Sequence, residues 1–360
     1  MKLEKEQLAV LKKSVARLHA VSKNISDAHV ALDLKYFQLK HPEFDVYMAA
    51  PGSWPDSKTE VSVKILNSVL AQIGPEAELS IENKVMIFKY GKTVLKIQGR
   101  SYDYQVNPPT PGQGFIFNNG LLSEIFSAGG MIKEDPFLSG SHITMTTDSL
   151  MVATTDGKQL VVIDHPYKFE TVNAPEYIRT ALISINTAKA ISMLGKGLPG
   201  AMKLERDRVL FTLDTGTMII ARCKTNQFPD YKKYLEAPMK TKYQVESKAV
   251  AEALKRLGSV VDDEKVRTTL HFSGEELTIS LPHEAGKDVV PMVPLSHDAA
   301  FDSVEEEFDF QYRFLVNTFS VLNDTVIIEA NGNDKAVMFR DGLPAAQKYV
   351  RVLVQPLSRK

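Results

Sequence analysis

A threefold internal repeat constrains this chain more than any other feature of its sequence. In each third, a Ser-hydrophobic-Leu triplet precedes a polar turn and a hydrophobic run that ends in phenylalanine. The triplets end at Leu70, Leu194 and Leu322, and the runs end at Phe88, Phe211 and Phe339. Successive copies are about 125 residues apart, far beyond the roughly 20 to 50 residues of a solenoid repeat. The spacing instead suits three copies of a whole domain, each with its own hydrophobic core.

Hydrophobic periodicity predicts the same order of elements in each third: helix, strands, helix, strands. Apolar residues at helical spacing predict helices over 3–22, 61–73, 118–128, 186–194, 247–260 and 312–322. Alternating segments predict strands over 31–38, 142–147, 150–154 and 271–280, and hairpins over 78–98 and 202–223. The stretches 108–112 and 236–242 are typical of linkers. We therefore expect an α+β fold of three tandem domains, 1–110, 111–240 and 241–360, each with two helices and antiparallel sheets.

The composition is that of an ordinary globular protein without a membrane span. Of the 360 residues, 44% are hydrophobic and 24% are charged, and the formal net charge is −1. No apolar run approaches the roughly 20 residues that a membrane span requires, and the charged N-terminus does not resemble a secretory signal. The single cysteine, Cys223, excludes an internal disulfide framework and favours a reducing compartment. We expect a cytoplasmic protein with no membrane partner.

Positive charge is concentrated on the predicted helices, although the net charge is near zero. The basic residues in or beside these helices include Lys12, Lys13, Arg17, Lys64, Lys189, Lys196, Lys248, Lys255 and Arg256. Carboxylates collect elsewhere, as in 262–264 and 298–309. The lysines could simply form the solvated sides of amphipathic helices. Their recurrence in all three thirds favours a shared cationic surface, which would attract nucleic-acid phosphates without reading base sequence.

Motifs that would indicate catalysis or cofactor binding lie in the wrong context. The segment 195–200 matches G-x-G-x-x-G, but it follows a predicted helix, and Pro199 removes a backbone donor. A dinucleotide fingerprint must follow a strand and open a helix, so we interpret the segment as a loop that ends a helix. The histidines have no metal-ligand spacing, and one cysteine cannot anchor a thiolate zinc site. The His-acid pairs at 283–284 and 297–298 fall in polar, loop-like stretches. We expect no enzymatic activity, no metal and no cofactor.

Three short segments resemble signature sequences of one known family. They read Thr-Thr-Asp-Gly-Lys-Gln-Leu at 154–160, Phe-Pro-Asp-Tyr-Lys-Lys-Tyr-Leu at 228–235 and Tyr-Val-Arg-Val-Leu-Val-Gln-Pro-Leu at 349–357. All three resemble the bacterial β sliding clamp, the β subunit of DNA polymerase III, whose family usually reads T-D-G-H-R-L at the first segment and F-P-D-Y-R-R at the second. The resemblance in residues runs from about position 115 to the end. In the first third it is carried by length and topology.

The resemblance implies a closed ring around duplex DNA. Two three-domain subunits would join head to tail, with the helices lining a channel and the sheets outside. The basic helix residues named above would contact the DNA backbone without base specificity. The seam between subunits would contain Val260 and Val261 from one subunit and Tyr102 or Tyr104 from the other. The two valines could equally be core residues at the end of a helix.

The resemblance also implies a hydrophobic cleft between the second and third domains. It would bind short peptide motifs of the replicative DNA polymerase, the clamp loader and repair factors. The matching positions are Leu138, Thr155, Gly157, Lys158, Gln159, Leu160, Pro229, Lys233, Tyr234, Val354, Gln355, Pro356 and Leu357. Leu160 and Val354 could alternatively be plain core. Lys158, Gln159 and Gln355 depart from the family pattern, which suggests a divergent or mobile-element clamp with its own motif preference.

Two other classes of protein stay open at this point. The runner-up is a β-rich repeat scaffold that binds proteins but encircles no DNA. The third class is an enzyme with a site that carries none of the motifs considered above, which would require converging catalytic groups that the sequence does not offer.

Overall fold

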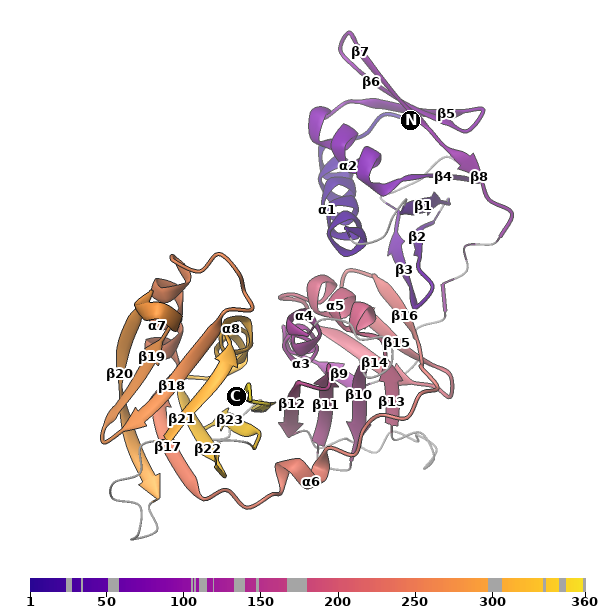
Figure 1. Ribbon diagram of the computed structural model, residues 1–360. Coiled ribbons are helices and arrows are strands. Elements are labelled where there is room, and N and C mark those ends of the chain that lie inside the picture. Colours follow the sequence, from indigo (N-terminus) through magenta and orange to yellow (C-terminus); the bar gives the residue numbers. More distant parts are fainter. Residues whose placement is uncertain are drawn as a thin grey trace. The chain divides into compact units, whose positions relative to one another are not determined.

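The same order of helices and strands recurs three times along the chain (Figure 1). In a computed structural model, each third has a first helix, four strands, a second helix and at least three further strands. Two short helices replace the first helix in the middle third, and one strand precedes the first helix in the second and third thirds. The recurrence agrees with the repeat in the sequence. The domain boundaries at 110 and 240 stay a prediction. The structure describes residues 1–23, 28–33, 35–50, 58–104, 106, 108–109, 115–118, 120–132, 140–146, 149–166, 180–296, 306–332, 335–342 and 348–358.

The chain divides into two compact units, each assembled from two separate segments. Unit 1 comprises Met1–Phe126 and Thr171–Lys224, and unit 2 comprises Ser127–Glu170 and Thr225–Lys360. A part of the middle third therefore belongs to each unit.

Unit 1 contains four helices among its described residues and two antiparallel sheets. Its helices are α1 (Lys5–Ser22), α2 (Val63–Gln72), α3 (Leu121–Ile125) and α5 (Ile185–Leu194). Its strands are β1 (His29–Leu32), β2 (Tyr36–Lys40), β3 (Phe44–Ala49), β4 (Thr59–Ser62), β5 (Glu78–Glu82), β6 (Val85–Tyr90), β7 (Thr93–Gln98), β8 (Arg100–Ser101), β9 (Phe115–Phe117), β13 (Thr180–Ile183), β14 (Gly200–Leu204), β15 (Arg208–Leu213) and β16 (Met218–Arg222). One sheet has the order β8-β4-β1-β2-β3-β16-β15-β14-β9, and the other has the order β5-β6-β7.

The helices of unit 1 pack through the apolar stripes that the sequence predicts. Leu8, Leu11, Val15 and Leu18 of α1 are all buried, because residues three and four apart lie on one face of a helix. This stripe packs α1 against α2 and α5. At its start, Glu4 and Gln7 form a reciprocal capping box that satisfies two backbone N–H groups.

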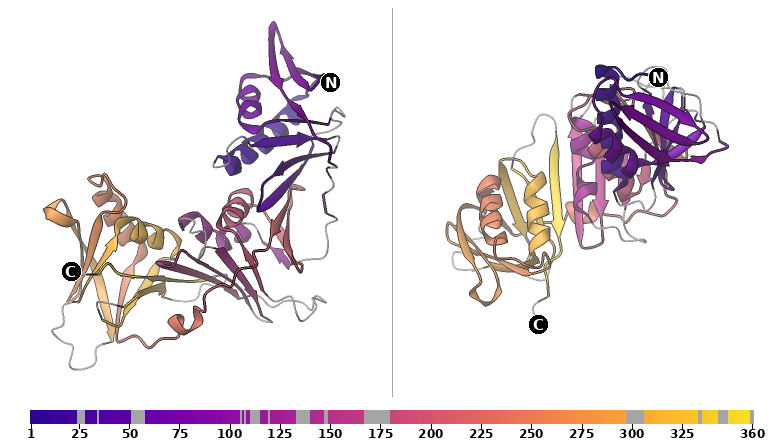
Figure 2. Two further views of the ribbon diagram at one scale, coloured as in Figure 1. Left: turned by 45° about the vertical axis from the view of Figure 1, so that its right-hand side comes forward. Right: turned by 90° about the horizontal axis from the view of Figure 1, so that it is seen from above.

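Unit 2 is built around one long succession of antiparallel strands. Its helices are α4 (Ala128–Met131), α6 (Lys232–Leu235), α7 (Ser247–Gly258) and α8 (Tyr312–Val321), with a 3₁₀ turn at Pro282–Glu284. Its strands are β10 (Gly140–Met145), β11 (Ser149–Thr155), β12 (Gln159–Pro166), β17 (Thr241–Glu246), β18 (Arg267–Ser273), β19 (Glu276–Ser280), β20 (Lys287–Ser296), β21 (Glu306–Gln311), β22 (Thr325–Ala330), β23 (Val337–Asp341) and β24 (Tyr349–Val354). Neighbouring strands follow the order β10-β11-β12-β24-β23-β22-β17-β20-β19-β18-β21. The helices α7 and α8 pack on one another beside these strands (Figures 1 and 2).

Several sequence-based boundaries were wrong. The segment predicted as one strand over 31–38 contains the end of β1 and the start of β2, which turn back on each other. Val61 and Ser62 belong to β4 rather than to the following helix, and the Ser62 hydroxyl accepts a hydrogen bond from the backbone N–H of Ile65 as the cap of α2 (3.5 Å). Both predicted hairpins are three-stranded meanders, because a further tight turn interrupts each, as at 83–84. The helix predicted over 118–128 consists of the short α3 and the start of α4.

No helix among the described residues is both long and apolar enough to cross a membrane.

Candidate functional site

A pocket in unit 2 brings together the three segments that carry the family resemblance. Its volume is about 270 Å³. One part comes from the turn between β11 and β12, another from the segment around α6, and the rest from β23 and β24. The lining residues are Thr155, Gly157, Lys158, Gln159, Leu160, Phe228, Pro229, Tyr231, Tyr234, Ala336, Leu353 and Gln355.

The turn at one end of the pocket is fixed by side-chain hydrogen bonds to its own backbone. Oδ1 of Asp156 accepts from the backbone N–H groups of Lys158 (2.9 Å) and Gln159 (2.8 Å). The Thr155 hydroxyl donates to the Gln159 carbonyl (2.8 Å) and accepts from the Gly157 N–H (3.0 Å). Gly157 has φ of +83°, in the left-handed region that suits glycine. The Thr-Asp-Gly sequence is therefore a turn signature with a physical cause.

The wall next to this turn is formed by paired strands. Leu160 of β12 lies directly opposite Leu353 of β24, and both line the pocket. Their neighbours Gln159 and Val354 also pair, but Val354 is fully buried and does not line the pocket. Because successive side chains of a strand point to opposite faces, Leu353 takes the place that we had assigned to Val354.

Gln159 ties the pocket to α8. Its side-chain amide donates to the Thr318 hydroxyl (3.2 Å) and to the Phe314 carbonyl (3.5 Å), both on α8. The side chain is almost completely buried. Gln159 therefore connects the strand β12 to the helix that supports it, while Lys158 beside it is exposed at the pocket rim.

The opposite wall is aromatic and comes from the segment that precedes and includes α6. Phe228 and Tyr231 meet edge to face with their ring centroids 5.7 Å apart. Tyr231 packs on Ala153, Leu160 and Val162 of the sheet, and its hydroxyl donates to Sδ of Met151 (3.3 Å). Tyr234 is half exposed at the rim. The pocket thus has apolar walls and a polar, basic rim, as ligand pockets usually have.

The structure brings together most, but not all, of the predicted cleft residues. Thr155, Gly157, Lys158, Gln159, Leu160, Pro229, Tyr234 and Gln355 line the pocket. Lys233, Val354, Pro356 and Leu357 do not line it, and Leu138 lies outside the described residues. Sequence reasoning did not single out Phe228, Tyr231 or Ala336, whereas Leu353 lies in the C-terminal segment proposed as one wall of the cleft. The motif at 228–235 already contained Phe228 and Tyr231.

The basic residues on the helices fall into two groups. Lys13, Lys64, Lys196, Lys248 and Lys255 are exposed, and Arg17 and Lys189 are partly exposed. Lys12 instead donates from Nζ to the Ile73 carbonyl (2.8 Å), and Arg256 pairs with Asp288 (Nε to Oδ2, 2.7 Å). These two charges already have partners within unit 1 and unit 2 respectively, so they are weaker candidates for contacts with phosphate.

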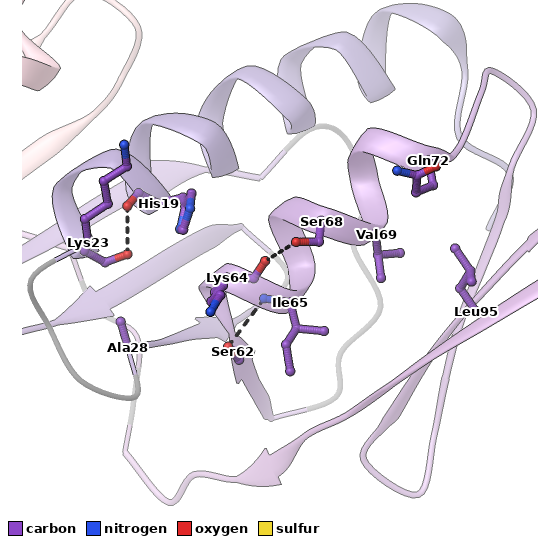
Figure 3. A pocket seen from close by; sticks show the side chains of 11 residues that line it. His19, Lys23, Ala28, Ser62, Lys64, Ile65, Ser68, Val69, Gln72 and Leu95 are labelled. Atoms are coloured by element: carbon purple, nitrogen blue, oxygen red, sulfur yellow. Dashed lines mark hydrogen bonds between the residues drawn. The ribbon is translucent and has the colours of Figure 1, made fainter.

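A second cavity of about 720 Å³ opens in unit 1 between the end of α1 and the start of α2 (Figure 3). His19 and Lys23 come from the end of α1, and Lys64 comes from α2. Ile65 and Leu95 supply apolar surface beside them. The cavity joins an apolar floor to a basic rim and places Lys64 in the same hollow as Lys23.

The residues predicted for a seam between subunits differ in exposure. Val260 is 55% exposed just after α7, and Val261 is partly buried. Tyr102 is instead 6% exposed, packs with Tyr47 and Met218, and donates its hydroxyl to the Leu32 carbonyl (3.0 Å). Tyr104 lies against Tyr102, and its hydroxyl donates to Glu60 (3.2 Å). The two tyrosines therefore belong to the packing of unit 1 itself.

The remaining candidates for chemistry have structural roles. In 195–200, Gly195 caps the C-terminal end of α5, and its N–H donates to the Ile191 carbonyl (2.8 Å). Burial raises the pKa of the Cys223 thiol, and the negative charge of Asp207 raises it further. A thiol with a raised pKa is a poor nucleophile at neutral pH. Among the described residues, no group of three or more His, Cys, Asp or Glu side chains could hold a metal ion.

Comparisons with known proteins give a consistent answer. No family model matches the chain. In sequence it is similar to the β sliding clamp of Synechococcus elongatus, at 22% identity over 315 residues that cover 82% of this chain and 80% of the relative. Among solved structures, DNA polymerase III β subunits from Pseudomonas aeruginosa and Thermotoga maritima match with TM-scores of 0.76 and 0.77, at 12% and 16% identity. Each match covers 100% of this chain, and 100% and 99% of those two chains.

A sliding clamp from Bartonella birtlesii, solved bound to griselimycin, matches with a TM-score of 0.76 at 17% identity, over 100% of this chain and 99% of its own. All four relatives are named as β sliding clamps, DNA polymerase III β subunits, or both. In sequence this chain is therefore similar to a β sliding clamp, and it shares the α+β fold of DNA polymerase III β subunits.

Proposed function

We propose that this protein is a DNA sliding clamp, which encircles duplex DNA and tethers the replicative polymerase and other DNA-processing proteins to it. The observation that carries the proposal is the pocket of unit 2, in which the segments 155–160, 228–234 and 353–355 meet. Its apolar walls and polar rim suit a short hydrophobic peptide motif of a polymerase or a clamp loader. In this proposal the protein is a non-catalytic tether, since its functional parts are surfaces that bind DNA and peptides.

Attraction to DNA comes from the exposed basic residues on the helices of both units. Lys13 and Lys64 lie on helices of unit 1, and Lys248 and Lys255 lie on α7 of unit 2. Lysine attracts phosphate as a point charge and reads no base edge. Binding of this kind is independent of base sequence and allows a protein to slide along the duplex.

A repeated pattern of strand pairing supports a head-to-tail dimer. The last strand of the middle third, β16, pairs with β3 of the first third, and the last strand of the final third, β24, pairs with β12 of the middle third. By the same pattern, β7 would pair with residues 287–291 of β20 in a second copy. Among the described residues, this half of β20 pairs only with β19. Among the described residues β7 ends its sheet and exposes Val94, while β20 exposes Val289 and Val293. Apolar side chains at both places are what an interface between subunits requires.

Replacing Leu160 with alanine tests the peptide pocket. The variant removes one wall of the pocket, and a few buried apolar anchors carry most of the affinity of such sites. We expect affinity for a synthetic peptide of glutamine followed by leucine and phenylalanine to fall about tenfold or more. The measurement is fluorescence anisotropy, with griselimycin as a second probe. Leu277→Ala, at a buried leucine of β19 away from the pocket, controls for lost stability. Unchanged affinity in Leu160→Ala would place the peptide site elsewhere.

Retention on circular DNA separates the clamp from a repeat scaffold that encircles nothing. A loaded ring stays on nicked circular DNA in high salt and slides off when the DNA is cut once. A scaffold bound only to the surface dissociates from both forms alike. Equal loss from circular and linear DNA would therefore favour the scaffold.

A further inference from the structure

A third of the residues that line the pocket come from one segment, and among the described residues this segment contacts the sheet only through side chains. Phe228, Pro229, Tyr231 and Tyr234 all come from residues 225–239. Among the described residues, the backbone of 225–239 makes hydrogen bonds only to itself and none to the strands. An example is the bond from the Leu235 N–H to the Tyr231 carbonyl (3.3 Å). The position of this wall therefore depends on how its side chains pack on the strands beneath.

His142 lies at the centre of that packing although it does not line the pocket. Its ring stacks on Phe228 with the centroids 5.1 Å apart and the planes 11° from parallel. It also meets Tyr231 edge to face at 6.4 Å. Phe228 and Tyr231 thus both pack against one imidazole of β10. His142 faces the same side of the sheet as Ala153, which lies directly opposite it on β11. Ala153 belongs to the apolar cluster under Tyr231.

The Thr144 hydroxyl links His142 and Tyr231 through polar contacts. Oγ1 of Thr144 lies 3.3 Å from Nδ1 of His142, and it hydrogen-bonds the Tyr231 side chain. The Tyr231 hydroxyl also donates to Sδ of Met151. The imidazole therefore stacks on Phe228 and abuts the ring of Tyr231, while Thr144 contacts both His142 and Tyr231.

We propose that His142 is a positioning residue of the partner pocket, which holds the aromatic wall in its binding geometry by stacking on Phe228 and abutting Tyr231. This inference rests on the proposed function of the pocket as a peptide site. His142 touches no bound peptide; it raises affinity by reducing the freedom that the wall loses on binding. An aromatic pair of this kind contributes an amount that corresponds to about a two- to tenfold change in affinity.

The charge state of His142 makes peptide affinity depend on pH. A residue that only supported the fold would not produce this dependence. Burial, followed by the positive charge of Lys232, lowers the pKa of His142 below its ordinary value of 6.5. The titratable groups that face it are Lys232 and Tyr231 from the segment above, whereas Thr144 and Ala153 beside it carry no charge. The neutral imidazole is thus the form that stacks. Protonation, which occurs only on acidification below the ordinary range, places a cation in a partly buried site near Lys232 and weakens the stack.

Three variants of the full chain test the proposal with the glutamine-leucine-phenylalanine peptide, its termini blocked so that it does not titrate. His142→Ala should weaken binding by about two- to tenfold, and His142→Phe, which keeps the stack, should bind within about twofold of the parent. The parent should lose affinity as the pH falls below the ordinary histidine pKa of 6.5, whereas His142→Phe should show a flat profile. His271→Ala, at a histidine of β18 outside the pocket, should match the parent at every pH.

The proposal fails if His142→Ala binds as tightly as the parent, or if the parent and His142→Phe share one pH profile. The outcome for Leu160→Ala separates this failure from that of the proposed function. If Leu160→Ala loses binding while His142→Ala does not, the pocket stands and only the role of His142 falls. If neither substitution changes binding, the pocket is not the peptide site. Should His142→Ala fold poorly, the comparison of the parent with His142→Phe across pH still decides the matter.

Discussion

At the scale of single residues, the turn at the edge of the pocket shows how closely sequence and geometry are linked. Gly157 adopts a φ of +83°, which an ordinary side chain tolerates poorly. Around it, the side chains of Asp156 and Thr155 accept hydrogen bonds from three backbone N–H groups and donate one to a backbone carbonyl, all within residues 155–159. The turn ends at Lys158 and fixes where β12 begins at Gln159, so it sets one side of the pocket.

Substitution of Gly157 should therefore affect both stability and binding. Gly157→Ala places a Cβ in the left-handed region, which costs about 1–2 kcal/mol of unfolding free energy. Gly157→Asn should cost less, because asparagine visits this region more readily. Urea unfolding measures stability, and a peptide titration measures the pocket. If alanine and asparagine behaved identically to glycine in both, backbone conformation at this position would not matter to the site.

Residue types alone indicate the turn at Thr-Asp-Gly, because aspartate and glycine favour turns. The place of Leu160 in the cleft rested on the family resemblance, with plain core as the alternative, and its role in binding stays a proposal. Leu353 rather than Val354 lines the pocket because of the register of β24 against β12, and sequence does not give a register directly. His142 escaped notice because its partners, Phe228 and Tyr231, lie far along the chain. Tyr102 was placed at a surface, but packing buries it.

At the scale of elements, the helices carry the charge that the DNA-binding proposal requires. The helix α7 buries Val250, Ala253, Leu254 and Leu257 and leaves Lys248 and Lys255 exposed. The amphipathic pattern thus makes the same helix a packing element on one side and a cationic surface on the other. The pattern predicted the surface, but it could not show that Lys12 and Arg256 would have partners of their own.

Removing four of these charges should weaken DNA binding in a way that depends on salt. In a variant with Lys13, Lys64, Lys248 and Lys255 changed to serine, each lost phosphate contact reduces the salt slope by roughly 0.9, or by about 3 to 4 units if all four contact phosphate. DNA affinity is measured by anisotropy from low to moderate salt. The control variant changes four exposed lysines outside the helices, Lys35, Lys58, Lys240 and Lys265. Equal slopes in the two variants would show that the helices are not the DNA-binding surface.

At the scale of the whole molecule, a sliding clamp requires a closed ring, and closure requires an interface between copies. Val260 exposes 55% of its surface just after α7. Its side chain lies near Gly286, where an added Cβ would come 3.8 Å from Cγ2 of Val260. Gly286 directly precedes β20, the strand that the repeated pairing pattern assigns to the seam. Val260 is thus an exposed apolar side chain beside a strand proposed to meet a second copy.

Val260→Asp should convert the dimer into a folded monomer. An aspartate desolvated in an apolar interface costs several kcal/mol, whereas on a free monomer it stays hydrated at little cost. Light scattering at low micromolar concentration gives the mass, and circular dichroism confirms the fold. Val10→Asp is the matched control, because Val10 on α1 is similarly exposed, at 51%. A Val260→Asp protein that stays dimeric would exclude this valine from the seam.

The threefold repeat and the α+β class could be recognised from the sequence, because leucine and phenylalanine positions recur with each copy of the domain. The two compact units could not, since each unit takes part of the middle third. That division follows from which strands pair across thirds, as β16 does with β3 and β24 does with β12. The strands at the sheet edges have similar hydrophobic patterns in the three thirds. These patterns therefore do not indicate which edge strand pairs with which.

The pairing of β12 with β24 also determines when the pocket can form during synthesis of the chain. Its two strands are roughly 200 residues apart in the chain. During synthesis on a ribosome, Leu160 leaves the exit tunnel long before Leu353 does. The pocket cannot form until β24 has emerged and paired with β12. Peptide binding, as proposed for this pocket, would therefore begin only after this part of unit 2 has folded.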